Sequence, residues 1–536
     1  MPEHREKATL GRVRLQDETT GATLLVPQPS SDPNDPLNWS KPFKAYVAIL
    51  TCLALLWVNF FAAGPSAVMV EIVIDLYKAY PPGPSNPATL TPAATAAFSS
   101  AVTKVALLFS TASLAAGVCN LMWVPLAVKY GRRTVYTCSF LVFGLCCVWA
   151  AKATSYTSLI AARIIASWFA GSAECVAPIT IADVFFLHER GQMTAVYSAA
   201  LSSGASLGSL VAGVMSASQN WRTFHYLCAA LVLCTTALIF FTMPETAFQR
   251  DAVGSDDETN DKVPAFSEVE SIQVVNTPKK KTLIHRMAFR RSPLTHESIW
   301  KIALRPMTVI WIPSVLWSTV AFGIGIGIFV VVSTTAATAY TQIYHFTNWQ
   351  VGLVWIASII GNVLGMPFGG YFSDWVASRA TSKNGGIREP EMRLPAVSVA
   401  MFSYPASLLL YGLGINYKAH WMVPTLGIFL FSFGSSAAIG ISVVYTIDCY
   451  RPIAGEIVVA QVAFKSIVTF LMSFYANAWI DTSGYTGAFG TMAGFSFFVL
   501  ALWLPLYIWG KRIRHATLKW RIMRLAHWDS DRETGE

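Results

Sequence analysis

Long apolar segments alternate with short polar connections along most of the chain. A transmembrane helix needs about 20 predominantly apolar residues, and twelve segments approach or exceed that length. The hydropathy pattern predicts helices over about residues 43–66, 103–126, 134–152, 156–178, 191–216, 222–243, 309–333, 349–371, 394–413, 421–446, 458–480 and 488–510. Ser40 and Pro42 fit the N-cap and first-turn positions of the first helix. The pattern predicts an all-α polytopic membrane protein.

A long polar stretch, residues 245–305, separates the first six predicted helices from the last six. It begins with the acidic segment DDETND and ends with the basic segments PKKK and FRR, a composition typical of a partly disordered linker. We therefore expect five parts, namely an N-terminal tail (1–42), an N-terminal six-helix bundle (43–244), a central linker (245–305), a C-terminal six-helix bundle (306–510) and a C-terminal tail (511–536).

The distribution of lysine and arginine predicts the orientation in the membrane. Of the 39 such residues, two fall within spans (Arg163 and Lys465), and all but five of the others fall on the side that both termini share. Those five are Lys78, Lys104, Lys152, Arg222 and Lys418. By the positive-inside rule, both termini and the linker are cytoplasmic. The first forty residues lack an apolar signal region, so we expect no cleaved signal peptide and expect the first helix to act as the targeting signal.

Composition supports a membrane protein and excludes several functional classes. Charged residues make up 13% of the chain, against roughly 25% in soluble domains. The net charge of +9 follows from the cytoplasmic cations and needs no nucleic-acid partner. The nine cysteines lie mostly in apolar segments and suggest no disulfide framework. The chain has no His-Glu-x-x-His zinc motif, nucleophile elbow or Walker sequence, so we expect neither an enzyme nor ATP-driven transport.

Charged residues cluster in two short connections at equivalent places in the two halves. The connection after the second helix holds Lys129, Gly131, Arg132 and Arg133. The connection after the eighth, GGYFSDWVASRA (369–380), holds Asp374 and Arg379. One interpretation is that these charges only set topology. The repetition favours an internal duplication of a six-helix unit, as in many secondary transporters.

Six motifs together resemble the major facilitator superfamily, and most closely its fungal twelve-span drug:proton antiporter branch with organic-cation and polyamine-transporter relatives. They are DPNDPLNWSKPFK, PLAVKYGRR, AARIIASWFAG, ADVFFLHERG, MPET and DCYRPIAGE, and the resemblance covers nearly the whole chain from about residue 31. It implies a monomer in the plasma membrane, without cofactor, that moves a small organic molecule by alternating access with the proton gradient as its energy source.

The resemblance also assigns a cytoplasmic gate to the first charged connection. The family motif there has an aspartate, a basic residue and Gly-Arg-Arg. Residues 131–133 match and Lys129 fills the basic position, but Val128 replaces the aspartate that in the family helps latch the two halves. Asp374 keeps the aspartate in the second half. The implied gate has therefore lost half of its anionic partner.

Arg163 and Glu174, both in the fourth predicted helix, are the candidates for proton coupling. Arg163 matches the family's arginine linked to proton transfer, and a cation within a span normally faces a cavity or a partner. The alternative is a packing arginine bonded to backbone carbonyls. Glu174 lies eleven residues further, on the same helix face but roughly 16 Å along the axis. A desolvated carboxyl there can exchange protons near neutral pH; the alternative is a hydrated residue near the cytoplasmic mouth.

Six residues within spans are candidates to line a substrate cavity: Asn59, Trp317, Asn362, Tyr445, Lys465 and Asn477. The aromatic rings can hold cations by their faces. Each asparagine has helix packing as its alternative role. Lys465 has three open roles, which are binding an anion, pairing with a carboxylate across the cavity, or reaching to the membrane interface.

The fifth helix contains SSGASLGSLVAG, which partly matches the family's antiporter motif. Gly204, Gly208 and Gly213 match, whereas Ser209 replaces a proline and Ala212 replaces a glycine. Small residues at this spacing permit close helix contact in any membrane protein. The sequence favours proton-coupled export of a small organic molecule. Proton-coupled uptake of an organic cation or polyamine is the alternative, and a non-transporting sensor is a remote one.

Overall fold

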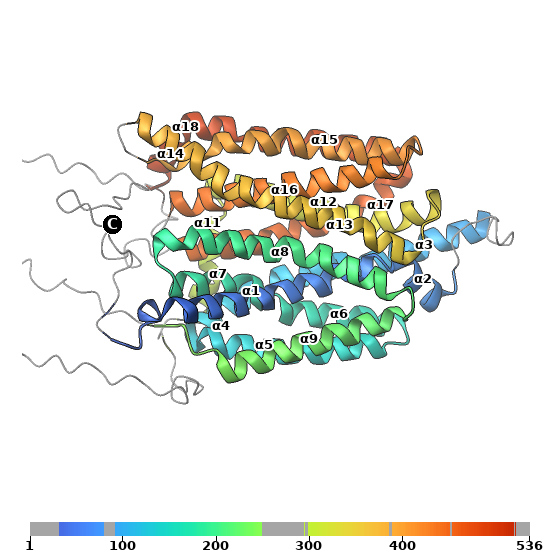
Figure 1. The fold of residues 1–536 in the computed structure, drawn as a ribbon, viewed down its shortest axis with the longest axis horizontal. Coiled ribbons are helices and arrows are strands. Elements are labelled where there is room, and N and C mark those ends of the chain that lie inside the picture. The colour runs from blue at the N-terminus through green and yellow to red at the C-terminus, as the bar shows by residue number, and fades with distance from the viewer. Residues whose placement is uncertain are drawn as a thin grey trace, which may run out of the picture.

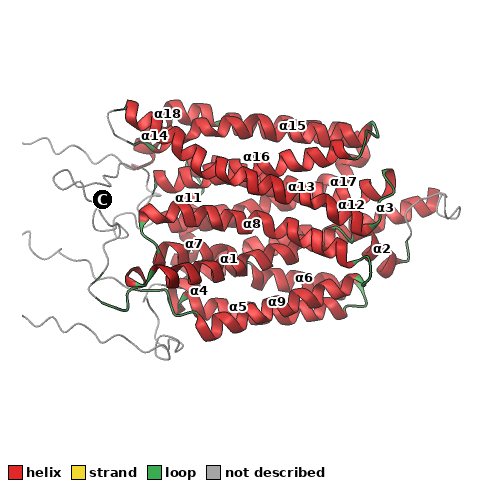
Figure 2. Cartoon of the chain, in the orientation of Figure 1, coloured by secondary structure: helices red, strands yellow, loops and turns green. Residues whose placement is uncertain are grey.

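The computed structural model describes residues 32–79, 92–248, 298–384, 388–450 and 453–518, with Ser30, Leu294 and Trp520. Among the described residues, helices joined by short loops and turns make up the structure, with no strand (Figure 2). Twelve helices in this part are long and apolar enough to cross a membrane, in the order that the hydropathy pattern predicts. The predicted all-α polytopic fold class is confirmed. The predicted tails and central linker lie mostly outside the described residues.

Several spans are assembled from two consecutive helices. The helices are α1 (Lys41–Ala63), α2 (Met69–Tyr77), α3 (Pro92–Val118), α4 (Asn120–Tyr130), α5 (Arg132–Lys152), α6 (Tyr156–Ala170), α7 (Ser172–Val184), α8 (Leu187–Met215), α9 (Trp221–Thr242), α11 (Ile299–Val309), α12 (Pro313–Ile343), α13 (Asn348–Pro367), α14 (Ser373–Lys383), α15 (Val397–Asn416), α16 (Met422–Cys449), α17 (Ala454–Ala501) and α18 (Trp503–Leu518). The α3–α4, α6–α7 and α13–α14 pairs each form one span. Gly484, with a φ of +66°, interrupts α17 near the start of the twelfth span.

The seventh span begins later than the hydropathy pattern predicts. Residues 299–309 form the separate helix α11, and Pro313 then stands in the first turn of α12. Proline fits a first turn because its missing N–H would be unsatisfied there anyway, so Pro313 restarts the helix. At the first span the prediction was closer, since Ser40 is the N-cap residue of α1 and Pro42 lies in its first turn.

The helices form two halves that lie side by side, α1–α9 in blue to green and α11–α18 in yellow to red (Figure 1). Two hydrophobic cores follow this division, one drawn mainly from residues 39–243 and the other from residues 309–506. We call the end at which α1 begins and α18 ends the inner end, and the opposite end the outer end. The lysine and arginine distribution predicts that the inner end faces the cytoplasm.

The segment before α1 folds back on itself at the inner end. Asp35 caps the short helix Pro36–Asn38, accepting a hydrogen bond from the Leu37 N–H at 3.0 Å. The same carboxylate accepts from the backbone and hydroxyl of Ser30. The motif DPNDPLNW therefore has a local structural role, because its Asp35 side chain accepts hydrogen bonds from the turn that precedes the first span.

Two seams join the halves, α8 along α13 and α3 along α17. Each seam carries a buried hydrogen bond between serine hydroxyls, Ser206 to Ser358 at 2.7 Å in the first and Ser110 to Ser473 at 2.6 Å in the second. Ser358 also bonds Ser432 of α16 at 2.6 Å, so three hydroxyls form a chain across the first seam. Small polar residues let the two backbones approach closely while leaving little side chain to interlock.

The three motif glycines of α8 serve two different contacts. A Cβ atom on Gly204 or Gly208 would meet the backbone of α1, at 2.6 Å from Leu56 O and 2.3 Å from Phe60 O. A Cβ atom on Gly213 would lie 2.5 Å from the Cα atom of Gly352 in α13. Two glycines therefore pack the first half internally, and the third sets the approach of the two halves.

We expect Gly213→Ala to weaken the α8–α13 seam. The added methyl group meets backbone rather than a movable side chain, and overpacking of this kind costs about 1–3 kcal/mol. The measurement is thermal unfolding of the purified protein in detergent, together with its transport rate in vesicles. Gly494→Ala is the matched control, since a Cβ atom there meets nothing within 4 Å. Equal melting temperatures for the two variants would contradict the role of Gly213.

Candidate functional site

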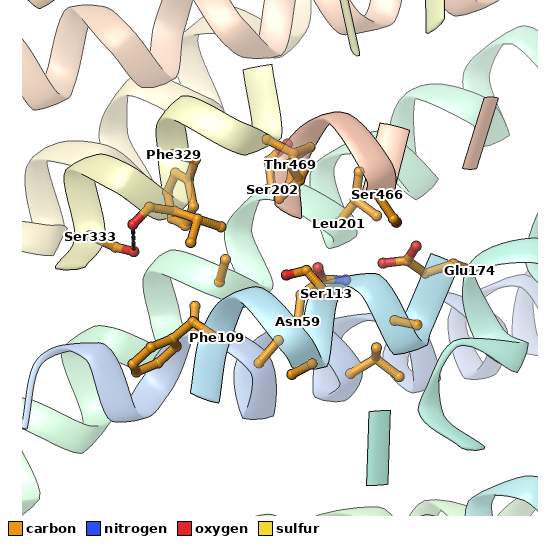
Figure 3. A pocket seen from close by; sticks show the side chains of 18 of the residues that line it. Asn59, Phe109, Ser113, Glu174, Leu201, Ser202, Phe329, Ser333, Ser466 and Thr469 are labelled. Carbon is orange, nitrogen blue, oxygen red and sulfur yellow. Dashed lines mark hydrogen bonds between the residues drawn. The ribbon is translucent and has the colours of Figure 1, made fainter. Parts of the chain in front are cut away.

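A cavity of about 100 Å³ lies between the two halves. Its lining comes from α1, α3, α6, α7 and α8 on one side and from α12, α13, α16 and α17 on the other. Figure 3 shows side chains from both halves pointing into it. Phenyl rings and small polar groups make up much of the lining: Phe61, Phe109, Phe329 and Phe431, with Asn59, Ser113, Ser202, Ser333, Asn362, Ser435 and Thr469. Among the described lining residues, only Glu174 and Lys465 carry a formal charge.

Glu174 and Lys465 form an ion pair across the cavity. The Lys465 Nζ atom lies 3.0 Å from Glu174 Oε2, and the two side chains are 4% and 9% exposed. The same ammonium lies 4.6 Å from the centre of the Phe322 ring. Glu174 belongs to α7 and Lys465 to α17, so the pair joins the two halves. Of the three roles left open for Lys465, the structure shows the pairing with a carboxylate.

The two charged residues stand at nearly the same depth. Helix α7 ends and helix α17 begins at the inner end. Glu174 is ten residues from that end of α7, and Lys465 is eleven residues from that end of α17. At 1.5 Å per residue each lies about 15–16 Å from that end, near the middle of a span. In Figure 3 the Glu174 carboxylate reaches towards the helix that carries Ser466 and Thr469. Glu174 is thus a buried cavity residue and not a hydrated residue at the mouth.

Glu174 owes its position to a close approach of α3. The α6–α7 joint passes α3 at Gly171, where a Cβ atom would lie 2.4 Å from Cys119 Sγ and 2.5 Å from Ala116 O. Glu174 follows this glycine in the first turn of α7, and its own N–H bonds the Gly171 carbonyl. A glycine is needed at the joint because the backbone of α3 leaves no room for a side chain.

Arg163 does not line the cavity and does not contact Glu174. Its Nη2 atom donates to Ala62 O at 2.9 Å, and its Nε atom donates to Leu108 O at 3.4 Å. The guanidinium lies about 5 Å from the centres of the Phe61 and Phe109 rings, which separate it from the cavity. These contacts match the packing role that the sequence left as an alternative. A part for Arg163 in proton transfer stays a prediction.

The other five predicted cavity residues have three different outcomes. Asn59 of α1 and Asn362 of α13 line the cavity, and Asn362 Nδ2 also donates to Ser202 O across the α8–α13 seam at 3.3 Å. The prediction is wrong for Trp317 and Tyr445, which pack on each other inside the second half, with ring centres 6.1 Å apart. Both helices carry apolar residues on all sides, so no pattern in the sequence indicates which face meets the cavity. The side chain of Asn477 lies outside those that the structure describes.

At the inner end, the charged connection between α4 and α5 interacts with carboxylates from other parts of the first half. Arg132 Nε lies 2.9 Å from Asp183 Oδ2. The Glu245 carboxylate accepts from the backbone N–H groups of Arg132 and Arg133 at 2.8 and 3.3 Å. Gly131, with a φ of +95°, lies against Glu245, where a Cβ atom would come within 2.2 Å. Asp183 and Glu245 belong to the motifs ADVFFLHERG and MPET, but the sequence alone did not assign them a partner.

The equivalent cluster of the second half is also internal. Asp374 lies 2.8 Å from Arg393 and 3.0 Å from Arg388, and Arg393 also reaches Asp448 at 3.3 Å. Arg379 stacks on the Trp375 ring. Each cluster thus ties helices of its own half together.

Contact between the halves at the inner end comes from helix packing, of α4 on α11 and of α7 on α17. The Lys129 carbonyl accepts a hydrogen bond from the Leu294 N–H at 2.8 Å. The contacts described at this end therefore differ from the latch between halves that the resemblance implies.

Glu391 and Arg514 form the most enclosed ion pair at the inner end of the second half. Arg514 Nε and Nη2 each donate to one Glu391 oxygen at 2.8 Å, and both side chains are 6% exposed. Glu391 precedes α15 and Arg514 belongs to α18, so this bidentate pair fixes the ninth span to the twelfth. A fork of this kind is among the strongest side-chain contacts available.

Comparisons with known proteins agree on one family. The family model described as Major Facilitator Superfamily matches residues 52–452. An uncharacterized MFS-type transporter of Schizosaccharomyces pombe is 26% identical over 93% of this chain and 89% of its own length. Efflux pump radE of Floropilus chiversii is 27% identical over 90% and 83%. In structure, the chain resembles the xylose transporter XylE of E. coli, described as a proton:xylose symporter, with a TM-score of 0.57, 13% identity and coverage of 87% and 98%.

We expect Glu391→Gln to destabilise the second half. The substitution removes the bidentate carboxylate partner of the buried Arg514 guanidinium, and such losses cost about 3–5 kcal/mol. Thermal unfolding in detergent measures the effect. Asp374→Asn is the control, because the Asp374 side chain is 52% exposed and exposed ion pairs contribute about 0–1 kcal/mol. A melting temperature for Glu391→Gln at or above that of Asp374→Asn would contradict the expectation.

Proposed function

The chain belongs to the Major Facilitator Superfamily of transporters, and on that premise we propose that it exports a small organic molecule in exchange for protons, with the Glu174–Lys465 pair as the coupling centre. It is an integral multi-pass membrane protein and a secondary transporter rather than an enzyme, as the sequence predicted. The observation that carries the proposal is the buried ion pair between the halves, in a cavity with no other charged lining residue among those described.

The ion pair supplies a link between protonation and conformation. In alternating access the two halves separate first on one side and then on the other, so contacts between them must break and re-form. Breaking a buried ion pair exposes each partner to an environment that compensates its charge poorly, at a cost of several kcal/mol. Protonation changes the charge on one partner and with it the cost of separation. Proton binding at this pair therefore changes the balance between conformations.

The size of the cavity supports a closed state of a transporter. Sites for small organic ligands usually have volumes of about 300–1,000 Å³, and this cavity of about 100 Å³ is smaller. The halves contact each other at the inner end through α4 and α11 and at the outer end through α2 and α12. A substrate therefore requires the halves to move apart before it can enter.

Similarity to an efflux pump and the glycines of α8 favour export over uptake. Efflux pump radE is similar to this chain over most of both sequences. The glycines of α8 match the family's antiporter motif in part. The lysine and arginine distribution supports an inner end in the cytoplasm, and export from the cell is the reason that we propose the plasma membrane as the location. Uptake by symport is the second candidate, because the fold is also that of the symporter XylE.

The test is proton movement in sealed proteoliposomes, with a panel of lipophilic cations and neutral toxins. We expect a substrate gradient to drive protons in the opposite direction in the wild type. Glu174→Gln should reduce this flux at least about tenfold, since it removes the charge that binds Lys465, and a tenfold change corresponds to only about 1.4 kcal/mol. Glu389→Gln is the control, because Glu389 also pairs with a lysine, Lys511, at 3.0 Å but lies outside the cavity, in a pair exposed enough to contribute about 0–1 kcal/mol.

Other outcomes would overturn the proposal in distinct ways. Protons that move in the same direction as the substrate would show symport and support uptake. A Glu174→Gln protein with the coupled flux of the wild type would remove the ion pair from the coupling mechanism. Proton fluxes that no compound changes, in either protein, would point to a facilitator or a sensor.

A further inference from the structure

The cavity is electrically neutral, and this limits what it can bind. It contains one carboxylate and one ammonium in direct contact. The titratable groups around Glu174 are the thiols of Cys119 and Cys175 and the phenol of Tyr197, and none of these is a formal charge that could offset another ion. Lys465 faces the Phe322 ring. An extra charge held in this cavity therefore has no partner unless the existing pair rearranges.

We propose that the substrate is an organic monocation that takes the place of the Lys465 ammonium at Glu174, and that Lys465 releases the exchanged proton. This inference rests on the proposed function. In the step, the substrate cation pairs with the Glu174 carboxylate, the N–H bond of the displaced ammonium breaks, and the proton passes to water on the inner side. Lysine is left as the neutral amine, so the occupied cavity again holds one positive and one negative charge.

The return step restores the pair seen in the structure. After the substrate leaves at the outer side, Lys465 takes a proton from water there and pairs again with Glu174. The halves then return with the closed ion pair. One cation has moved outward and one proton inward, so the cycle moves no net charge. A site that stayed neutral in both directions avoids the cost of carrying an uncompensated charge through a low-dielectric interior.

The requirement for exchange identifies the charge of the substrate. Exchange needs substrate and proton to exclude each other at the site. A cation does so, because it competes with the Lys465 ammonium for one carboxylate. An anion would instead pair with Lys465 and leave Glu174 free to take up a proton. Anion and proton would then travel together, as in symport. Given export driven by inward protons, the pair selects a cation, and its single carboxylate selects one positive charge.

The lining supports an organic cation independently of this argument. Phe61, Phe109, Phe329 and Phe431 present phenyl rings to the cavity, and ring faces attract ammonium groups that have lost their water. Lys465 itself is held in this way by Phe322. The hydroxyl and amide oxygens of the lining accept hydrogen bonds from a protonated amine.

Lysine is suited to this task, and arginine is not. An ammonium on a flexible stem can leave its partner, and desolvation readily removes its proton. A guanidinium pairs with a carboxylate equally well but does not deprotonate in proteins. Lys465→Arg therefore keeps the ion pair and removes the proton that the proposal requires, which separates pairing from exchange.

The experiment uses the full-length protein in sealed vesicles with the membrane potential clamped. The probes are tetraphenylphosphonium, a protonatable aromatic amine, benzoate and a neutral aromatic amide. We expect a pH gradient to drive uphill movement of the cations in the wild type, with no change when the potential is altered. In Lys465→Arg this movement should fall at least about tenfold, equivalent to about 1.4 kcal/mol. In Lys465→Gln the cations should move only down their own electrochemical gradient and should respond to the potential.

The matched control is Lys44→Arg. Lys44 is also a buried lysine, 4% exposed, with its Nζ atom 4.5 Å from the centre of a phenyl ring, that of Phe186, but it lies outside the cavity. The Lys44→Arg variant should exchange cations for protons as the wild type does. Thermal unfolding in detergent tests whether each variant is folded, so that a loss of flux can be distinguished from a loss of folding.

Three results would overturn this inference, and they differ from a failure of the proposed function. Coupled exchange that survives in Lys465→Arg would assign the proton to another group. Benzoate movement coupled to protons in the wild type would show an anion site. Exchange of the neutral amide for protons, equally in the wild type and in Lys465→Arg, would support proton-coupled export but contradict a cationic substrate. If no probe moves protons in the wild type, the proposed function itself fails.

Discussion

The ion pair between Glu174 and Lys465 is the contact on which the functional interpretation depends. It joins the two halves at mid-depth, in a cavity whose remaining described lining is apolar or neutral and polar. A buried ion pair contributes little to net stability, because desolvation offsets most of the attraction, yet removing one partner is costly. Such a pair is poorly explained as a structural fastening. It is well suited to a site where one partner has to be exchanged.

Small residues and hydroxyl pairs line the two seams between the halves. The α8–α13 and α3–α17 seams are held by small residues and single hydroxyl pairs, such as Ser206 with Ser358 and Ser110 with Ser473. These hydroxyl contacts are short-range and replaceable, and Gly213 brings the backbone of α8 against that of α13. Contacts of this kind can break and re-form when the two halves change their angle.

The charged contacts described at the inner end lie inside each half. Arg132 with Asp183 and the backbone bonds to Glu245 hold the inner end of the first half, and Arg514 with Glu391 holds that of the second. Because these contacts do not cross between the halves, each half can move as one body. The charged connection after the second span thus holds together helices of its own half, through carboxylates from two other places in the chain.

The sequence by itself determined the twelve spans, their order, and the positions of the buried charges and small residues. These features are local: the length of an apolar run and the cost of a charge inside it follow from a few neighbouring residues. It also predicted that Asn59, Asn362 and Lys465 stand within spans, although not what they contact. The helix α11 was not predicted, because Lys301 and Arg305 make its first part resemble the polar linker.

Only the tertiary structure decided which side chains meet. The sequence left three roles open for Lys465, and the packing of α17 against α7 brings it to Glu174. Trp317 and Tyr445 were expected in the cavity and lie instead in the core of the second half. The physical reason is the same in each case. A membrane helix that is apolar on all sides carries no pattern that fixes its rotation, so its facing is set by the helices around it.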